Sequence, residues 1–478
     1  MKKFSLSQNI KWLAALPFLA ALAFLAVTLT SCTKLLRIPP NPSNEIPSSS
    51  VFADSSDIMS AVAGIYTNFG LAEQSGTLLD GLVTICTGLT GDELVPAPTN
   101  QPGDLQFYEN AIRNTNTNDD FLWSSGYSSL YQINVCLSGI AGSTAISSAL
   151  QQQLTGELEV DRALCYFHLV NLFGPVPLVT TADYHVSESL PRASVAQIYA
   201  QVITDLTSAQ QLLTAAYPSA GTARPNLYVA DALLAKVYLY TGQWQNAENA
   251  ASSVISSGSY SLNTDLNTVF LDGSNEAIWQ LPANSAYTQT YEAALFIPYV
   301  NTVPSYSLDT GLLNAFEAGD QRLQDWTAID TVNVNGSNMT YYYPFKYKNT
   351  LASATPVEDY MIFRLAELYL IRAEAEAEIG GNQLASAIAD LNLIRQRAGL
   401  LPYAGVANPA SVLAAIAHER QVELFCEWGN RWYDLNRTGT INTVLGAEKA
   451  GWTATDSLYP IPLPELQRNP FLTQNAGY

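Results

Sequence analysis

The chain has 478 residues, 48% of them hydrophobic and 13% charged, and its 42 acidic residues outnumber 22 basic ones to give a net charge of −20. This hydrophobic content excludes a disordered chain, and the length suits two or three average domains or one large helical array. The acidic balance excludes a nucleic-acid partner, because phosphate binding needs a basic face, and it disfavours direct contact with anionic lipid.

The N-terminus has the pattern of an export signal. Three lysines flank the start of an apolar run from Trp12 to Leu29, and the sequence LTSC, ending at Cys32, follows. This order is typical of a secretory signal, and its end resembles the lipobox of bacterial lipoproteins, although an ordinary signal peptide or a lone membrane helix is the alternative. We expect residues 1–31 to be a lipoprotein signal peptide, with Cys32 lipidated and residues 32–50 a flexible tether.

Apolar residues recur at helical spacing between residues 51 and 260, which we expect to form an N-terminal TPR-like helical part. A first helix is predicted from about Asp57 to Phe69, and further helices are expected at 121–140, 151–173, 194–217, 228–240 and 246–256. The stretch from Gly91 to Asn118 is rich in Pro, Asn and Asp, so we expect it to be a long surface loop.

Two segments of the chain repeat one pattern. Gly242 is followed by Ala247 and Ala251, and Gly380 is followed at the same offsets by Ala385 and Ala389, each time between two amphipathic segments. Small residues at fixed distances from a turn glycine let paired helices approach closely, as in tetratricopeptide repeats. The predicted fold is therefore mostly α, a TPR-like helical array of about four helix pairs.

Residues 261–357 differ in character from the rest. Tyr and Asn are abundant, five prolines interrupt any long helix, and Glu276 to Leu281 is predicted to be a short strand. Helical sequence resumes at Asp359 and continues to Ala398. We expect an irregular, loop-rich and aromatic-rich ligand-binding part containing short strands at 261–357, followed by a C-terminal helical pair and tail at 358–478.

The stretch from His418 to Gly439 concentrates charge in a chain that has little of it. Read as a helix ending near Gly429, it places three carboxylates on one stripe, where like charges repel: Glu419, Glu423 and Glu427. Their nearest cationic partners along the chain are Arg420, Arg431 and Arg437. An intramolecular ion-pair network is the expected role, because spacing along one helix cannot establish a catalytic carboxylate pair.

No motif in the chain indicates catalysis, a metal or a cofactor, and we expect a non-enzymatic protein. The three histidines lack metal-ligand spacing, and no Walker A, GxGxxG or GxSxG motif is present. His168 is expected to be a core residue, and Cys165 and Cys426 are expected to be buried thiols. Cys86 and Cys136 would be able to pair after export, but nothing in the sequence fixes their separation.

A sugar-binding site needs exposed flat rings beside amide and carboxylate groups. The loop-like segments of this chain carry both. The predicted stacking rings are Tyr108, Tyr287, Tyr291 and Trp326, and the predicted hydrogen-bonding neighbours are Asn284, Gln289 and Asp325.

Four stretches resemble the SusD/RagB family of outer-membrane lipoproteins. They are GELEVDRALCYFHLVNLFGPVPL at 156–178, the region 364–399 with RLAELYLIRAEAEAEIGG and LNLIRQRAG, the charged stretch 418–439, and YPIPLPELQRNPFLTQNAGY at 459–478. Members of this family sit on the outer membrane of Bacteroidetes as lipid-anchored, surface-exposed proteins.

The resemblance implies a carbohydrate-binding protein of nutrient uptake that delivers oligosaccharides to a SusC-like TonB-dependent transporter. In the RagB branch of the family the cargo is peptides, so a peptide ligand is the first alternative. A TPR-type protein-interaction scaffold without a small ligand is the second alternative; it predicts that the aromatic residues of 261–357 are buried.

Overall fold

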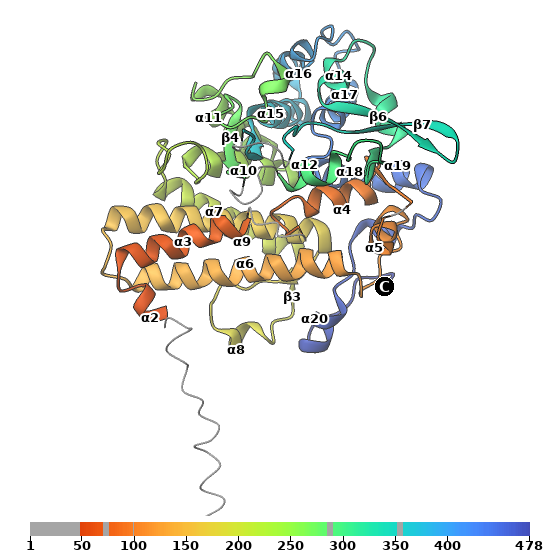
Figure 1. The fold of residues 1–478 in the computed structure, drawn as a ribbon. Helices are drawn as coiled ribbons and strands as arrows, with labels where there is room; N and C mark the ends of the chain where they lie inside the picture. Colours follow the sequence, from red (N-terminus) through yellow and green to blue (C-terminus); the bar gives the residue numbers. More distant parts are fainter. Residues whose placement is uncertain (1–47, 70–75, 99, 284–289, 351–356) are drawn as a thin grey trace, which may run out of the picture.

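Long helices dominate the computed structural model, which describes residues 48–69, 76–98, 100–283, 290–350 and 357–478 (Figure 1). Cys32 and the tether therefore lie outside the described residues. The helices up to residue 260 are α2 (Ser48–Val51), α3 (Ser55–Phe69), α4 (Leu82–Thr90), α5 (Pro102–Tyr108), α6 (Thr117–Gly142), α7 (Ser148–Phe173), α8 (Tyr184–Ser187), α9 (Val195–Leu212), α10 (Leu227–Tyr240) and α11 (Trp244–Ser256). The helices predicted for this part are confirmed, with ends that differ by a few residues.

Local sequence sets several of these helix ends. The Asn116 side chain accepts hydrogen bonds from the first backbone N–H groups of α6, and Ser194 and Gln197 form a capping box at the start of α9. Helix α7 ends at Phe173 and is capped by Gly174, whose φ of 70° favours glycine. Such ends are readable from sequence, which explains why these helices were predicted.

The segment from Gly91 to Asn118 is not the long surface loop that its composition predicts. It contains β1 (Leu94–Pro96) and α5, and Phe107 is fully buried. Strand β1 pairs antiparallel with β5 (Tyr306–Leu308), more than 200 residues away in the sequence. Pairing with a distant strand buries this segment, and local composition cannot reveal such a partner.

The TPR-like array is confirmed, but the equivalence of its alanines is wrong. Helix pairs α10–α11 and α15 (Leu365–Ile379)–α16 (Leu384–Arg397) pack together, α11 contacts α15, and α17 (Pro409–Glu423) lies against α15 and α16. Ala247 and Ala251 are buried in α11, whereas Ala385 and Ala389 are exposed and Ala387 is the buried alanine. Helix α11 begins two residues after its turn glycine and α16 begins four residues after Gly380, so the buried position shifts by two.

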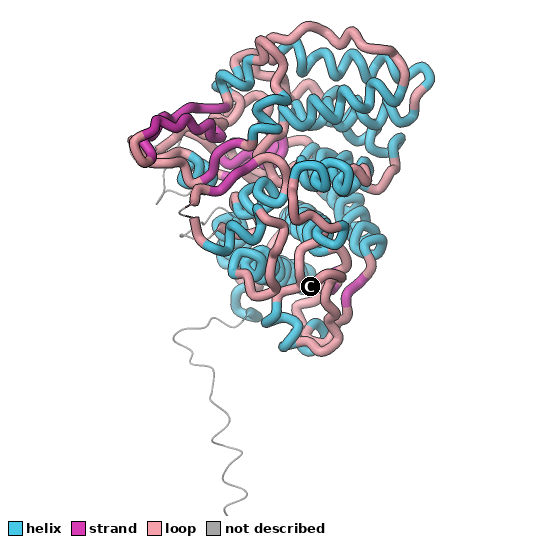
Figure 2. The backbone as a smooth tube through the Cα atoms, turned by 90° about the vertical axis from the view of Figure 1, so that its right-hand side faces the viewer, coloured by secondary structure: helices cyan, strands magenta, loops and turns pink. Residues whose placement is uncertain are grey.

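The middle of the chain alternates short helices and strands. They are η1 (Leu266–Thr268), β4 (Ala277–Leu281), α12 (Tyr291–Phe296), α13 (Thr310–Ala315), α14 (Gln321–Asp325), β6 (Thr327–Val334) and β7 (Ser337–Pro344), besides β5. The predicted strand at 276–281 is confirmed as β4. Strands β6 and β7 form an antiparallel hairpin that extends from one side of the molecule (Figures 1 and 2).

Strand β4 pairs antiparallel with β8 (Tyr360–Arg364), which joins the two ends of the middle region. The helix predicted from Asp359 is therefore wrong over its first residues, and helix α15 begins only at Leu365. All five residues of β8 are buried. A strand buried on both faces has a continuous apolar sequence, and periodicity does not distinguish it from the start of a buried helix.

Four short helices close the chain: α18 (Asn430–Arg437), α19 (Ile441–Glu448), η3 (Ala454–Ser457) and α20 (Leu463–Arg468). The remaining strands, β2 (Val176–Pro177) and β3 (Arg192–Ala193), pair beside α7 and α9. Across the part of the chain that the structure describes, no helix is both long enough and apolar enough to cross a membrane.

The charged stretch 418–439 is largely buried, and it is not one helix. Helix α17 ends at Glu423, and a turn with positive φ at Cys426 (50°), Trp428 (52°) and Gly429 (72°) leads into α18. The Cys426 backbone N–H donates to the Glu93 carboxylate at 3.1 Å, which holds the turn in this sparsely populated conformation. The predicted helical stripe of three carboxylates is therefore wrong: Glu419 and Glu423 lie in α17, but Glu427 lies in the turn after it.

The expected ion-pair network exists, but the predicted partners are wrong. The carboxylates of Glu419, Glu423 and Glu427 pair with cations from other elements, namely Arg322, Arg364, Arg397 and Lys346. The cations of the stretch pair elsewhere: Arg420 and Arg437 with Asp434, Arg437 also with Glu374, and Arg431 with Asp92. Proximity in the sequence did not identify these pairs, because they form between segments brought together by the fold.

Candidate functional site

Of the seven side chains predicted to bind ligand, the four that the structure describes differ in their exposure to solvent. Asn284, Tyr287 and Gln289 lie outside the described residues. Tyr108, Tyr291 and Asp325 are half-buried, and Trp326 is fully buried.

The prediction that Trp326 stacks on a ligand is wrong. Its exposure is 0%, and its indole N–H donates to the Leu266 carbonyl at 2.9 Å. The Lys346 ammonium lies 4.8 Å from the centre of the ring, and the Arg364 guanidinium lies 5.5 Å from it. Trp326 therefore packs against the buried cations of the ion-pair network, where cation–π contact stabilises them.

Tyr108 and Tyr291 are partly committed to packing. The Lys449 ammonium lies 4.1 Å from the centre of the Tyr108 ring and also donates to the carbonyls of Leu89 and Tyr108, and burial lowers its pKa to about 8. The Tyr291 ring lies so close to Gly76 and Gly81 that a Cβ on either would be 2.6 Å from a ring carbon. Each ring thus has one side occupied by the protein.

Tyr108 and Tyr291, two of the predicted residues, lie on elements that pack on the same side of the fold. Strand β1 precedes α5, which carries Tyr108, and pairs with β5, which packs beside α12 and Tyr291. Tyr306 of β5 donates to the Asp104 carboxylate of α5 at 3.0 Å. Asp325 ends α14, directly before the β6–β7 hairpin.

One of the exposed Phe and Tyr rings lies beside these positions, whereas Phe121, Tyr131, Tyr184 and Phe471 are exposed elsewhere in the described part of the chain. Tyr299, in the segment that leads to β5, is 79% exposed, and β5 packs beside β7. On the hairpin, Ile329 and Met339 are exposed, and the run Tyr341 to Tyr343 is half-buried. We call this surface, formed by residues 297–308 and 327–344, the hairpin edge. Sequence reasoning did not select its rings, because their exposure depends on how distant segments pack together.

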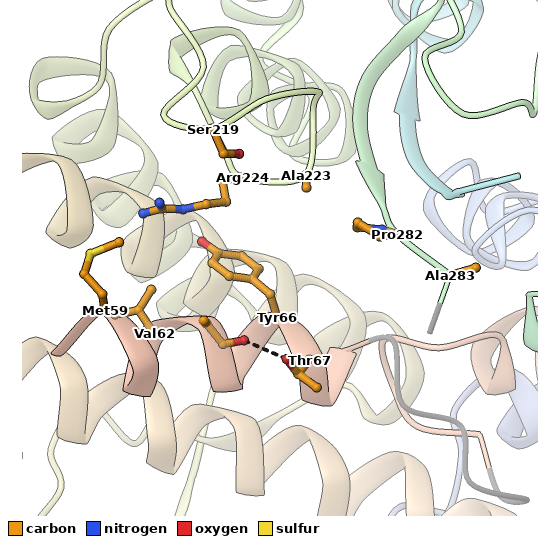
Figure 3. A pocket seen from close by; sticks show the side chains of 10 residues that line it. Met59, Val62, Tyr66, Thr67, Ser219, Ala223, Arg224, Pro282 and Ala283 are labelled. Atoms are coloured by element: carbon orange, nitrogen blue, oxygen red, sulfur yellow. Dashed lines mark hydrogen bonds between the residues drawn. The ribbon is translucent and has the colours of Figure 1, made fainter. Parts of the chain in front are cut away.

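A pocket of about 470 Å³ opens at a different place, along α3 (Figure 3). Helix α3 supplies its floor, and the connection between α9 and α10 and the residues after β4 supply its walls. The lining residues are Met59, Val62, Ala63, Tyr66, Thr67, Ser219, Ala223, Arg224, Pro282 and Ala283. The lining is mostly apolar, with one tyrosine ring, one guanidinium and the hydroxyls of Thr67 and Ser219, and none of these residues was selected as a site residue from the sequence.

A buried carboxylate on α7 organises the polar end of this pocket. Glu157 is fully buried and accepts two hydrogen bonds from Arg224, both 2.7 Å long, and one from the Tyr66 hydroxyl at 3.1 Å. One turn further along α7, Asp161 is also fully buried, and burial together with the Glu157 charge raises its pKa well above the ordinary range. Burial therefore disfavours the charged form of Asp161, and the Arg224 guanidinium pairs with the Glu157 carboxylate.

The described residues show no metal-binding cluster. Within the ranges that the structure describes, no three His, Cys, Asp or Glu side chains converge as metal ligands do. His168 is buried, its Nδ1 lies 3.1 Å from the Tyr433 hydroxyl, and burial lowers its pKa to about 3, as suits a core residue. Cys86, Cys136, Cys165 and Cys426 are buried free thiols.

Comparison with known proteins agrees with this architecture. A family model described as "SusD family" matches residues 313–478, and one described as "Starch-binding associating with outer membrane" matches residues 48–239. SusD-like protein P25 of Formosa agariphila is 27% identical, with 95% of this chain and 98% of that protein aligned. The starch-binding protein SusD of Bacteroides thetaiotaomicron is 24% identical over 73% of this chain and 76% of that protein.

Solved structures show the same fold. A SusD superfamily protein from Bacteroides vulgatus superposes with a TM-score of 0.78 at 24% identity, over 89% of this chain and all of the other. A laminarin-binding SusD-like protein superposes with a TM-score of 0.74, also at 24% identity and with the same coverage. The two family models cover both halves of the fold, and the similarity to SusD-like relatives extends along nearly the whole chain. The chain belongs to the SusD-like family.

Proposed function

We propose that this chain is a lipid-anchored protein of the outer-membrane surface that binds oligosaccharides and delivers them to a SusC-like TonB-dependent transporter. The observation that carries the proposal is its similarity to proteins whose names describe glycan binding, starch for one and laminarin for another. Cys32 would be the lipidated residue, since it follows an apolar export signal.

The hairpin edge supports glycan binding. Protein rings that stack on sugars need an open face and nearby hydrogen-bonding groups. Tyr299 is 79% exposed, and exposed Asn333 and Asn338 occupy paired positions on the hairpin. Tyr108, Tyr291 and Asp325, which lie near this edge, remain proposed contributors, as do Asn284, Tyr287 and Gln289.

A binding panel tests the proposal and separates glycan from peptide cargo. The purified protein is titrated calorimetrically with laminarin oligosaccharides, starch oligosaccharides and a peptide mixture. Binding of an oligosaccharide that weakens in Tyr299→Ala supports the proposal, and exposed Tyr184 on α8 provides the matched control, Tyr184→Ala. Binding of peptides alone would show that the cargo is peptide and not oligosaccharide, and binding of neither would refute the proposed ligand class.

Two further measurements address the anchor and the partner. Incorporation of labelled palmitate into the wild-type protein but not into Cys32→Ala would support lipidation. Recovery of a TonB-dependent transporter with the wild-type protein, extracted from its own membrane, would support the partner. Failure to recover any barrel protein under conditions that preserve outer-membrane complexes would count against delivery.

A further inference from the structure

The pocket along α3 is built from side chains that are fixed before any ligand arrives. The Tyr66 hydroxyl and two donors of Arg224 all bind the fully buried carboxylate of Glu157, which also accepts a hydrogen bond from Gln153 at 3.0 Å. A side chain held by such a partner loses little further entropy when it contacts a ligand. The aromatic and guanidinium groups of the pocket are therefore pre-organised.

The opposite wall is anchored as well. The indole N–H of fully buried Trp279 donates to the Ala223 carbonyl at 3.1 Å, and the Gln280 backbone N–H donates to the Thr222 carbonyl at 3.3 Å. These bonds fix the connection between α9 and α10 to strand β4. The pocket is thus enclosed by three elements that hydrogen bonds hold at set positions.

The groups that remain to contact a ligand are the Tyr66 ring, one guanidinium N–H of Arg224 and the hydroxyl of Ser219. Tyr66 projects from α3 between the floor and the Ser219 wall (Figure 3). Arg224 uses Nε and Nη2 on Glu157, and its Nη1 has no hydrogen-bond partner among the described residues. A half-buried ring beside apolar Met59 and a spare guanidinium N–H suits a molecule with an apolar face and a hydroxyl-rich rim.

The charge balance of the pocket favours an uncharged molecule. Arg224 and Glu157 neutralise each other at 2.7 Å. An anionic ligand would compete with Glu157 for the guanidinium and would leave that carboxylate buried without its cation, which is strongly unfavourable. A cationic ligand would meet the guanidinium directly.

We infer that this pocket is a second sugar subsite, in which an uncharged pyranose ring stacks on Tyr66, accepts a hydrogen bond from Arg224 and exchanges hydrogen bonds with the Ser219 hydroxyl. The inference rests on the proposed function and extends it, because the pocket lies on α3 and not on the hairpin edge. Its volume of about 470 Å³ lies within the range of small-molecule sites, roughly 300–1,000 Å³.

The test uses the full-length protein in detergent with neutral laminarin and starch oligosaccharides, and with the sulfated form of whichever one binds. Tyr66→Ala removes the ring, and Ala63→Leu fills the pocket from an exposed helical position. Each is expected to weaken binding of the neutral oligosaccharide about tenfold, consistent with the loss of one stacked ring. Tyr66→Phe, which keeps the ring, and Ala200→Leu, at an exposed position on α9, are expected to stay within about threefold of wild type.

The outcomes separate this inference from the proposed function. Wild-type binding that Tyr66→Ala and Ala63→Leu leave unchanged would overturn the subsite and leave the proposed function intact. Tighter binding of the sulfated than of the neutral oligosaccharide, lost in the same variants, would overturn the uncharged ligand class. Absence of binding by the wild-type protein to every oligosaccharide would remove the proposed function and the subsite together.

Discussion

Glu423 is the most connected carboxylate of the ion-pair network, and its removal should destabilise the fold. It is fully buried, and its oxygens contact Arg364 at 2.5 Å, Arg322 at 2.9 Å and Arg397. Each of these cations keeps another carboxylate, respectively Glu427, Asp320 and Glu276. Removing one member of a buried ion pair costs about 3–5 kcal/mol, and the remaining partners place Glu423→Gln near the lower value, about 3 kcal/mol.

The assay is urea unfolding of the purified protein at pH 7, followed by tryptophan fluorescence. Glu465→Ala is the control, because its partner Arg468 is 73% exposed in the side chain and such a pair contributes under about 1 kcal/mol. The arginines hold the pKa of Glu423 well below its usual range, so its contribution is present at neutral pH and is lost only in strong acid. A Glu423→Gln variant that unfolds within about 1 kcal/mol of wild type, yet no longer binds ligand, would refute the structural role.

Three further predictions concern the core, pH and salt. Trp326→Ala should lower the free energy of unfolding by about 3–5 kcal/mol in the same assay, because it empties a fully buried site. Burial raises the pKa of Glu292 to about 8, so the folded protein keeps a proton on this carboxyl that the unfolded chain loses as pH rises from 5 to 8, and the free energy of unfolding should fall over that range. Urea unfolding at pH 5 and pH 8 should show that Glu292→Gln reduces this fall by up to about 1.4 kcal/mol per pH unit. Oligosaccharide affinity measured at low and high NaCl should change less than about twofold, since most described cations are held in internal ion pairs.

Features encoded by neighbouring residues were predictable from the sequence. Helix α7 ends just before Gly174 because glycine readily adopts the positive φ of this cap, and the apolar spacing within the helix defines its buried face. His168 was predicted to be a core residue from that same spacing, and it is buried. In each case the deciding contacts lie within a few turns of the chain.

Features that depend on distant partners were not predictable. Trp326 sits in a polar, tyrosine-rich region that looks solvent-exposed, but buried Lys346 and Arg364 cover its ring. The pocket along α3 needs Tyr66, Glu157 and Arg224, which come from three segments and meet only in the folded chain. Neither periodicity nor composition contains this information.

The charged stretch 418–439 connects elements that are far apart in the sequence. Through Glu423 and Glu427 it binds Lys346, which follows β7, and Arg364, which ends β8. Lys346 lies just beyond the hairpin of the hairpin edge, and β8 pairs with β4, whose end forms a wall of the α3 pocket. Both proposed ligand surfaces are therefore tied to this buried network. We expect this network to hold the two surfaces in place, since the carboxylates of Glu423 and Glu427 already pair with arginine and lysine.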